Sequence, residues 1–310
     1  HLVAGAPRRG PSPLRGDFLL SGPPVIPDRL AAAAFEEPDA PFLVAEDEVV
    51  SLGEADDRVA RIAGGLAQHG VVAGERVAIW GGIDVPTALT LLAAPRIGAS
   101  AVPLNTRLTP EEARRQADEA GVRLWVGHPD GPHEAVPFED VDGPLVAGMN
   151  RPGREEACVV FTSGTTGAAK GVRLSRAALD ASARASAEFL DHTHEDRWLA
   201  VLPLFHVGGL QVLIRSALIG GSVRLLGHFD VERVADAVED CTLASLVSPL
   251  LRRLLDAGVG PGRLRAVLLG GGPIPPGLAE EAMAAGWPVL PAYGQTETAS
   301  QVATCPPDTP

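Results

Sequence analysis

The stretch that decides the fold is Phe161-Thr162-Ser163-Gly164-Thr165-Thr166-Gly167-Ala168-Ala169-Lys170-Gly171. It follows the apolar run 157–161, which has the length and β-branched content of a buried strand, and it precedes a second short strand at 172–174. Glycines let the backbone of the intervening loop turn sharply and approach a ligand, and hydroxyls and an ammonium group donate to phosphate oxygens. A polyphosphate site is therefore predicted at Thr162, Ser163, Gly164, Thr165, Thr166, Gly167 and Lys170.

Lys170 is the only lysine in a sequence that has 26 Lys and Arg residues in total. A lysine side chain is a compact, flexible charge that can follow a moving phosphate. The alternative interpretation is an ordinary mobile surface turn, which is the usual role of a glycine loop. The hydroxyls, the lone lysine and the flanking strands together favour phosphate binding.

The loop does not match the Walker A pattern, in which glycine precedes the lysine and Ser or Thr follows it at the start of a helix. Here Ala169 and Gly171 flank Lys170, and the chain continues towards a strand. A P-loop phosphotransferase is therefore disfavoured.

Composition restricts the class of protein. The 310 residues are 45% hydrophobic and carry a formal net charge of -13, which argues against a nucleic-acid-binding surface and requires a local cationic cluster for any anionic substrate. Three cysteines without metal-type spacing are expected to be buried small hydrophobes, as suits a reducing cytoplasm. Residues 1–24 lack a signal-peptide core and are expected to be a tail, and Pro86, Pro95 and Arg96 interrupt the most apolar stretch, so no integral membrane span is predicted.

Strand and helix patterns alternate from residue 51 onwards. Capping signals at Ser51 and Thr109 mark two helix starts, the second with Pro110 at the first helical position. The alternation predicts an α/β fold built on open, mostly parallel sheet. The expected strands are 76–80, 101–104, 122–126, 198–202, 223–226, 243–247, 266–269 and 289–292, and the expected helices are 85–94, 175–190, 210–218, 231–238, 249–255 and 276–285.

Two side chains in the middle of the chain are candidates for substrate contact. His206 stands at a strand-to-helix turn, although a lone histidine is often structural. Arg215 lies in an apolar helical stretch without an acid nearby in sequence. A buried arginine needs an anionic partner, and a substrate carboxylate is one candidate. A buried ion pair or a snorkelling surface residue is the competing interpretation.

Two further motifs lie near the end of the chain. Gly270-Gly271-Gly272-Pro273 follows a strand and can let a flat ligand lie against bare backbone. In Tyr293-Gly294-Gln295-Thr296-Glu297, the only tyrosine of the chain offers a stacking face for a nucleotide base. Thr296 offers a hydroxyl to a phosphate, and Glu297 offers an oxygen ligand to Mg²⁺.

From about residue 25 to the end, these motifs together resemble the AMP-forming acyl-CoA synthetases and their adenylate-forming relatives. The one departure in the loop is Ala169, where the family usually has proline. The resemblance implies that Gly271, Gly272, Tyr293 and Gly294 hold adenine, that Thr296 contacts the α-phosphate, and that Glu297, with Thr166, binds magnesium. It also implies a passage between acyl and thiol sites at His206, catalytic roles for Lys170, His206, Thr296 and Glu297, and the use of ATP, Mg²⁺ and CoA.

Within that superfamily the sequence is most similar to the o-succinylbenzoate-CoA ligases of menaquinone synthesis. The similarity lies in 103–112, the spacing of His206 and Arg215, the triple glycine and 296–301. It implies substrate contacts from His206, Arg215, Gly271 and Ser300, and Arg215 would meet the second carboxylate of that substrate. Other acyl- or aryl-CoA synthetases share most of these motifs, and a nucleotide-binding module without turnover is a further alternative.

The family resemblance also predicts the domain organisation. Residues 25–310 correspond to the large N-terminal AMP-binding domain, with stacked, mostly parallel sheets and flanking helices. The small C-terminal domain of the family is expected to be missing from this chain, which should bind acyl-adenylate but catalyse poorly. Expected partners are a small carboxylic acid, ATP and CoA, with a possible homodimer and a cytoplasmic location.

Overall fold

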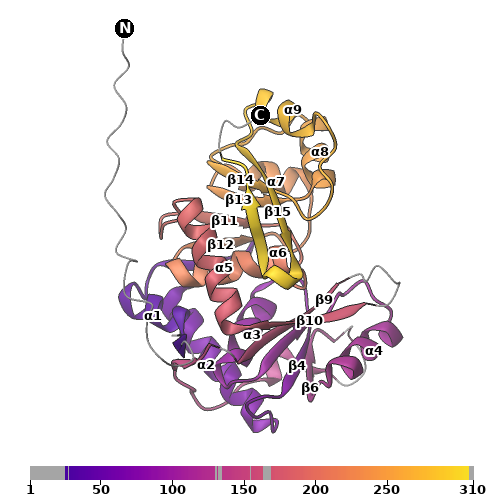
Figure 1. The fold of residues 1–310 in the computed structure, drawn as a ribbon. Coiled ribbons are helices and arrows are strands. Elements are labelled where there is room, and N and C mark those ends of the chain that lie inside the picture. Colours follow the sequence, from indigo (N-terminus) through magenta and orange to yellow (C-terminus); the bar gives the residue numbers. More distant parts are fainter. Residues whose placement is uncertain are drawn as a thin grey trace.

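The computed structural model describes residues 25–26, 28–129, 131, 135–153, 155–162 and 169–306. Two sheets dominate these residues and lie in two layers, with the six-stranded sheet below the eight-stranded sheet in Figure 1. Both sheets are mostly parallel, as predicted. The expected α/β fold with stacked sheets is therefore confirmed.

The six-stranded sheet has the strand order β10-β9-β5-β4-β6-β7. Its only antiparallel pair among the described strands is β9–β10, in which Thr162 lies opposite Lys170. The predicted phosphate loop therefore joins the two strands of a hairpin. The strands are β4 (Arg76–Trp80), β5 (Ser100–Pro103), β6 (Leu124–Gly127), β7 (Val136–Pro137), β9 (Glu156–Thr162) and β10 (Lys170–Ser175), accompanied by α2 (Leu52–Gln68), α3 (Val85–Arg96), α4 (Pro110–Ala120) and the 3₁₀ turn η1 (Phe138–Asp140).

The eight-stranded sheet has the order β16-β15-β14-β13-β11-β12-β2-β3. Its antiparallel pairs are β15–β16 and β2–β3, one at each end of the sheet. Its strands are β2 (Pro41–Val44), β3 (Val49–Ser51), β11 (Arg197–Ala200), β12 (Ser222–Leu225), β13 (Leu243–Leu246), β14 (Ala266–Leu269), β15 (Val289–Gln295) and β16 (Ser300–Thr304). The helices are α1 (Arg29–Glu36), α5 (Arg176–Phe189), α6 (Val207–Ile219), α7 (Val231–Ala237), α8 (Ser248–Asp256) and α9 (Leu278–Ala284), with the 3₁₀ turn η2 (Thr296–Thr298). A separate two-stranded pair joins β1 (Val25–Ile26) to β8 (Arg151–Pro152).

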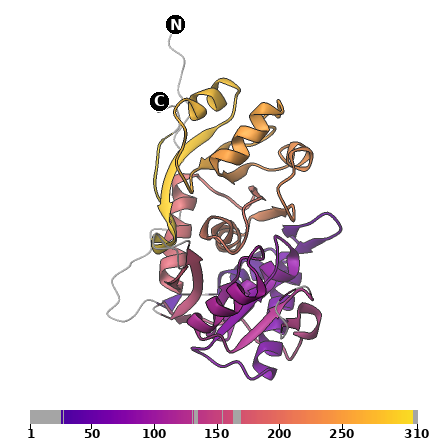
Figure 2. The ribbon, with the colours of Figure 1, turned by 90° about the vertical axis from the view of Figure 1, so that its right-hand side faces the viewer.

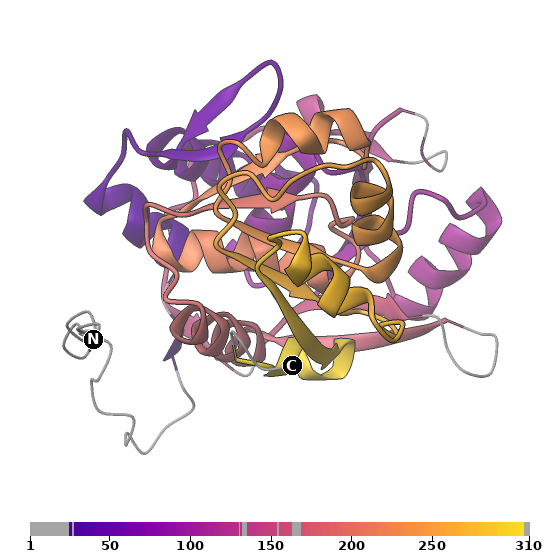
Figure 3. The same cartoon turned by 90° about the horizontal axis from the view of Figure 1, so that it is seen from above.

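The largest apolar core joins the two layers. It contains Val77 of β4, Leu66 of α2, Leu89 of α3, Leu213 of α6 and Val223 of β12, so these helices are buried between the sheets. A second core lies between the other face of the eight-stranded sheet and helices α7, α8 and α9, which cover that face in Figure 3. Figure 2 shows the β15–β16 ribbon running along one side of the molecule. The core therefore fixes α6 and the ribbon relative to both sheets.

Local capping explains where the helices begin. Ser51 Oγ accepts a hydrogen bond from the Glu54 N–H at 3.2 Å, and the Glu54 carboxylate accepts from the Ser51 N–H at 2.9 Å. The same reciprocal pair joins Thr109 and Glu112 at the start of α4. Each pair satisfies two N–H groups that a helix start leaves free. Both helix starts confirm the prediction from sequence.

Several parts of the fold differ from the sequence prediction. Helix α1, the β2–β3 hairpin and strand β16 were not predicted, and α3 continues through Pro95 to Arg96 instead of ending at Ala94. Cys158 and Cys241 are buried as expected, whereas Cys305 is only half-buried. In the part of the chain that the structure describes, no helix is long and apolar enough to cross a membrane.

Candidate active site

A cavity of about 110 Å³ lies at the carboxyl ends of β13, β14 and β15, beside the start of α6. Such crevices are where open α/β sheets bind ligands. Its lining includes Gly208, Arg215, Gly271, Tyr293, Gly294 and Ser300. The structure therefore brings together most of the residues that the sequence predicted for adenine and substrate.

The turn after β14 presents bare backbone. A side chain at Gly270 would put its Cβ 2.4 Å from the Ala292 carbonyl oxygen, and Gly271 has a positive φ of 74°, which side chains rarely adopt. Beside Gly272 there is open space instead. Because nothing projects from this turn, a flat group can lie directly on it, as predicted.

Tyr293 lies on β15, which continues to Gln295 and is longer than the sequence predicted. Its side chain is 60% exposed at the cavity, and its hydroxyl accepts a hydrogen bond from the Gln295 side-chain amide. An exposed aromatic ring beside the glycine turn leaves a face free for stacking. The geometry therefore fits a nucleotide base between the turn and the ring.

The segment that follows β15 has an unusual backbone. Ala299 and Ser300 have positive φ values of 55° and 115°, a conformation that costs about 1–3 kcal/mol for residues other than glycine. The Ala299 carbonyl accepts two hydrogen bonds at 2.9 Å, one from Gln211 Nε2 of α6 and one from Ser182 Oγ of α5. These bonds hold the chain in the strained conformation that directs Ser300 into the cavity.

Sequence reasoning missed Gln211 and Ser182. Gln211 is fully buried and also donates to the Leu179 carbonyl at 3.3 Å. The available signal was a single amide in the apolar run 210–214, which indicates a buried polar contact. Ser182 gave no signal, because a serine on a helix is usually solvated.

Arg215 is 1% exposed and packs over the ring of Trp198, with its guanidinium carbon 5.3 Å from the ring centroid. Its Nη2 contacts Ser300 Oγ at 3.4 Å, and its Nε lacks a hydrogen-bond partner. Among the side chains that the structure describes, no acid lies within ion-pair distance of this guanidinium. The two competing interpretations, an ion pair and a snorkelling residue, therefore do not apply.

Burial lowers the pKa of Arg215 to about 10. The side chain still carries its charge at neutral pH, in a place where water does not solvate it. A buried, unpaired cation is costly. The site is thus chemically suited to an anionic group that enters the cavity beside Ser300.

Thr296 and Glu297 lie on η2, which contacts β10. Glu297 is exposed, so its carboxylate is accessible for a metal ion or a phosphate-bound cation. Neither residue lines the cavity that contains Arg215. The contact with β10 nevertheless places this turn beside the strand that begins with Lys170.

His206 and Thr162 line a different cavity, of about 410 Å³, together with Asn105 and Ala169. His206 is the N-cap of α6 and packs against Phe205, with 4.5 Å between ring centroids. Desolvation by the surrounding protein, and to a smaller degree the charge of Arg107, lower the pKa of His206. A neutral imidazole at this position can accept a proton or a hydrogen bond from a ligand.

Lys170 is exposed at the first position of β10. The rest of the predicted phosphate loop, Ser163, Gly164, Thr165, Thr166 and Gly167, lies outside the described residues. The roles assigned to these residues therefore stay predictions. Thr162 is described and directs its hydroxyl towards the Lys170 carbonyl at 3.5 Å.

Comparison with known proteins identifies relatives of this chain. The 2-succinylbenzoate--CoA ligase of Bacillus cereus (strain Q1) is 36% identical over 297 residues, and that of Bacillus mycoides (strain KBAB4) is equally similar. Each alignment covers 91% of this chain and 61% of the relative. The chain therefore spans less than two thirds of the length of these curated relatives.

Solved structures similar to this chain include the same kind of ligase. O-succinylbenzoate CoA synthetase (MenE) from Bacillus subtilis in complex with the acyl-adenylate intermediate OSB-AMP is 32% identical, with a TM-score of 0.86, over 91% of this chain and 77% of that one. The same enzyme in complex with ATP and magnesium ion has a TM-score of 0.86 at 31% identity, over 92% and 63% of the two chains. Residues 30–310 match the family described as AMP-binding enzyme, and the chain belongs to that family.

Proposed function

We propose that this chain forms the nucleotide- and acid-binding part of an ATP-dependent, AMP-forming ligase that converts o-succinylbenzoate into its CoA thioester. The observation that carries this proposal is Arg215, a buried cation without an acidic partner in the described structure, in a cavity that also contains the glycine turn and Tyr293. One ligand that has both a nucleotide base and a free carboxylate would satisfy all three features. The acyl-adenylate of o-succinylbenzoate is such a ligand, and it is bound in a relative at 32% identity.

The reaction that fits this arrangement has two steps. A carboxylate oxygen of the acid attacks the α-phosphorus of ATP, the bond to the bridging oxygen of pyrophosphate breaks, and an acyl-adenylate forms. A thiol then loses its proton and attacks the carbonyl carbon, and AMP leaves with the electron pair of the acyl–oxygen bond. The protein mainly contributes positioning and charge neutralisation.

Each group of residues has a role in this proposal. The turn at Gly271 and Gly272 and the ring of Tyr293 would hold adenine, with Gly294 leaving room between strands. Thr296 would donate to the α-phosphate. Lys170 and the loop residues Thr162, Ser163, Gly164, Thr165, Thr166 and Gly167 would neutralise the leaving pyrophosphate.

Magnesium fits the residues present, because Glu297 is an exposed carboxylate without an ion pair in the described structure. Glu297, with Thr166, would hold the ion, which supplies positive charge to the phosphates when it is bound. Arg215 and Ser300 would orient the second carboxylate of the acid. His206 would line the entry of the thiol. Cytoplasmic location and a homodimer stay predictions.

The test is thermal stabilisation of the chain by non-hydrolysable acyl-sulfamoyl-adenosines. The acyl groups are o-succinylbenzoyl, its methyl ester, benzoyl and a long fatty acyl. A ligand at a hundredfold its dissociation constant adds about 2.7 kcal/mol, so we expect the o-succinylbenzoyl compound to raise the melting temperature most. The methyl ester lacks the charge, is larger by only one methyl group, and is the matched ligand control.

The protein variant that tests the role of Arg215 is Arg215→Met. It should weaken binding of the o-succinylbenzoyl compound by about 30-fold or more, because a buried charge pair is lost, and leave benzoyl binding nearly unchanged. Equal stabilisation by all four compounds would leave only a general adenylate site. Failure of every compound to bind would contradict the adenylate site itself, and ADP in place of AMP as the product of the full enzyme would contradict the reaction type.

A further inference from the structure

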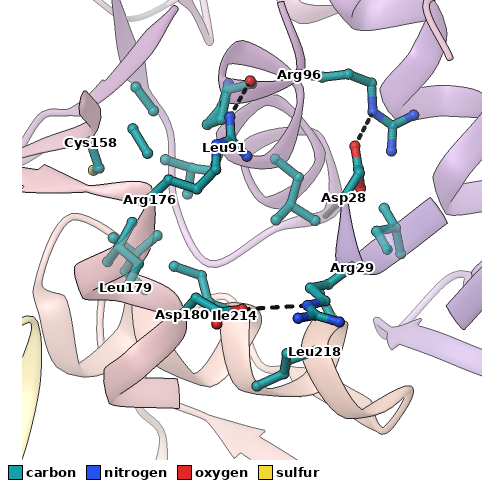
Figure 4. Close-up of a pocket in the computed structure, with 17 residues that line it drawn as sticks. Asp28, Arg29, Leu91, Arg96, Cys158, Arg176, Leu179, Asp180, Ile214 and Leu218 are labelled. Carbon is teal, nitrogen blue, oxygen red and sulfur yellow. Dashed lines mark hydrogen bonds and ion pairs between the residues drawn. The ribbon is translucent and has the colours of Figure 1, made fainter. Parts of the chain in front are cut away.

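A second cavity, also of about 110 Å³, lies away from the proposed active site, among helices α1, α3, α5 and α6 (Figure 4). Most of its wall is apolar, with Leu91 from α3, Leu179 from α5, and Ile214 and Leu218 from α6. Cys158 of β9 closes one side. Nothing in the proposed function uses this space, so the inference below goes beyond that function.

Two of the three arginines in the wall are paired. Arg96 Nε donates to Asp28 at 2.8 Å, and Arg29 Nε lies 3.4 Å from Asp180 (Figure 4). Each of these charges is therefore compensated within the wall. They act as part of the scaffold that joins α1 to α3 and α5.

Arg176, the first residue of α5, differs from them. Its Nη2 donates to the Pro95 carbonyl at 2.5 Å, and its Nε is buried without a partner. In the described structure no carboxylate lies within ion-pair distance of this guanidinium, although Asp28 and Glu155 act on it from farther away, with Arg151 opposing them. Burial, the largest effect, lowers the pKa of Arg176. The wall thus has a cationic group whose hydrogen-bonding capacity is only partly used.

The volume of the cavity restricts which ligand could bind Arg176. A cavity of about 150 Å³ holds one benzene molecule, so about 110 Å³ suits an apolar body of about four carbons. Several waters could also fit, but most of the lining offers them no hydrogen-bond partner. An apolar body with one anionic end matches both the wall and Arg176.

We propose that this cavity is a binding site for a small monoanion of the short-chain carboxylate class, with its carboxylate on Arg176 and its alkyl chain against α3, α5 and α6. The occupant is identified by Arg176, because Arg29 and Arg96 are paired with acids whereas no carboxylate lies within ion-pair distance of the Arg176 guanidinium in the described structure. A carboxylate that accepts from the free Nε would be a charge-assisted hydrogen bond in a poorly solvated place.

The two cavities use different faces of α6. Leu210, Ile214 and Leu218, spaced four residues apart, line the carboxylate cavity, whereas Gly208 and Arg215 line the proposed active site. Residues four apart lie on one side of a helix. A ligand at Arg176 therefore does not need Arg215, and binding at each site can be tested separately.

The experiment titrates the chain with trifluorobutyrate and follows the ligand by fluorine NMR, with trifluorobutanol as the neutral match. We expect millimolar binding of the carboxylate and much weaker binding of the alcohol. Arg176→Gln should weaken carboxylate binding by about tenfold or more. Arg173→Gln, which removes an exposed arginine outside both cavities, is the control and should leave it unchanged, while Arg215→Gln reports any binding in the other cavity.

Leu218→Trp provides an independent test, because a larger side chain at this lining position fills part of the cavity without changing its charge, and it should also abolish binding. Circular dichroism and the melting temperature establish that each variant is folded. Binding that survives in both Arg176→Gln and Leu218→Trp but is lost in Arg215→Gln would place the ligand in the proposed active site and overturn the proposal. Equal binding of the alcohol, or no binding at tens of millimolar, would overturn it as well.

Discussion

Two buried arginines in this molecule are treated in opposite ways. Arg96, at the end of α3, is 3% exposed and is held by Asp28 at 2.8 Å and Asp56 at 2.6 Å. Arg215, in α6, is 1% exposed, and its polar contacts among the described side chains are the Trp198 ring and the Ser300 hydroxyl. Arg96 completes a network of ion pairs, while Arg215 has no ion-pair partner in the described structure. Burial of a charge therefore does not indicate its role until its partners are known.

The difference extends to the surroundings of each arginine. Around α6, buried polar atoms without hydrogen-bond partners are found on several neighbouring side chains: His192, Trp198, Gln211, Arg215 and Ser216. Around Arg96 all three guanidinium nitrogens are used, the third by the Asp56 carbonyl at 3.2 Å. Polar groups that remain unpaired in a core are costly. Their concentration around α6 fits a region that is completed by a ligand.

The largest expected effect compares these two arginines directly. Arg96→Met should lower the free energy of unfolding by about 3 kcal/mol, because it leaves Asp28 and Asp56 without their cation. Arg215→Met should leave that free energy unchanged or raise it by about 1 kcal/mol, because an unpaired charge is replaced by an apolar side chain of similar length. Urea unfolding of both variants and the parent protein gives the two values.

Equal losses in the two variants would break the comparison, because Arg215 would then have a stabilising partner. A double variant that loses less than Arg96→Met alone would sharpen it. That result is the one expected if Arg215→Met is stabilising, because the two residues do not contact each other and their effects should add.

The next effect concerns His192, which is 7% exposed and packs edge-on against Trp198 with 5.8 Å between ring centroids. Burial, the largest cause, lowers the pKa of His192 to about 4 from the ordinary value of 6.5; Arg215 and Arg265 act in the same direction and Asp196 against it. The folded protein keeps the ring neutral, whereas the unfolded chain takes up a proton below about pH 6.5. Stability is therefore full above that pH and is lost as the pH falls towards 4.

In the parent protein, His192 should lower the free energy of unfolding by about 2 kcal/mol between about pH 7 and pH 5. His192→Leu should remove most of this loss while other titrating groups stay the same, which urea unfolding at the two pH values would show. An identical pH dependence in the variant would mean that the charged His192 ring has a hydrogen-bond acceptor in the folded protein. That result would remove His192 from the set of unsatisfied groups around α6.

The smallest expected effect tests the contact between α6 and the strained segment. Gln211→Leu removes the donor to the Leu179 and Ala299 carbonyls and should lower the free energy of unfolding by about 1–2 kcal/mol. Ser182→Ala, which removes the other donor to Ala299, is the matched control and should have a smaller effect because Gln211 remains. If Gln211 positions Ser300, its loss should also weaken the o-succinylbenzoyl ligand more than the benzoyl ligand.

Much of the fold follows from local sequence signals. Ser51 and Thr109 begin helices through hydrogen bonds that involve residues only three positions away, so the pattern alone identifies them. The β2–β3 hairpin could not be identified in this way, because Pro41–Val44 is short and becomes a strand by pairing with β12, about 180 residues later. Strand β16 likewise depends on its antiparallel partner β15.

Some features of the candidate site could likewise be predicted from the sequence, and others could not. Gly271, Tyr293, Ser300 and Arg215 were identified from sequence, and the structure brings them to one cavity. Sequence could not decide whether Arg215 was paired, because every candidate acid is distant along the chain. It also could not show that Gln211 supports Ala299, since that bond joins residues 88 positions apart.

Lys170 is both the only lysine of the sequence and an exposed residue at the edge of the described hairpin. A reagent that acylates side-chain amines can therefore modify this protein at one side chain only. The same position can accept a single fluorophore or isotope label without any engineered residue. The chain thus contains a natural reporter beside its predicted phosphate loop, and the rate of its acylation would measure how often a bound nucleotide covers it.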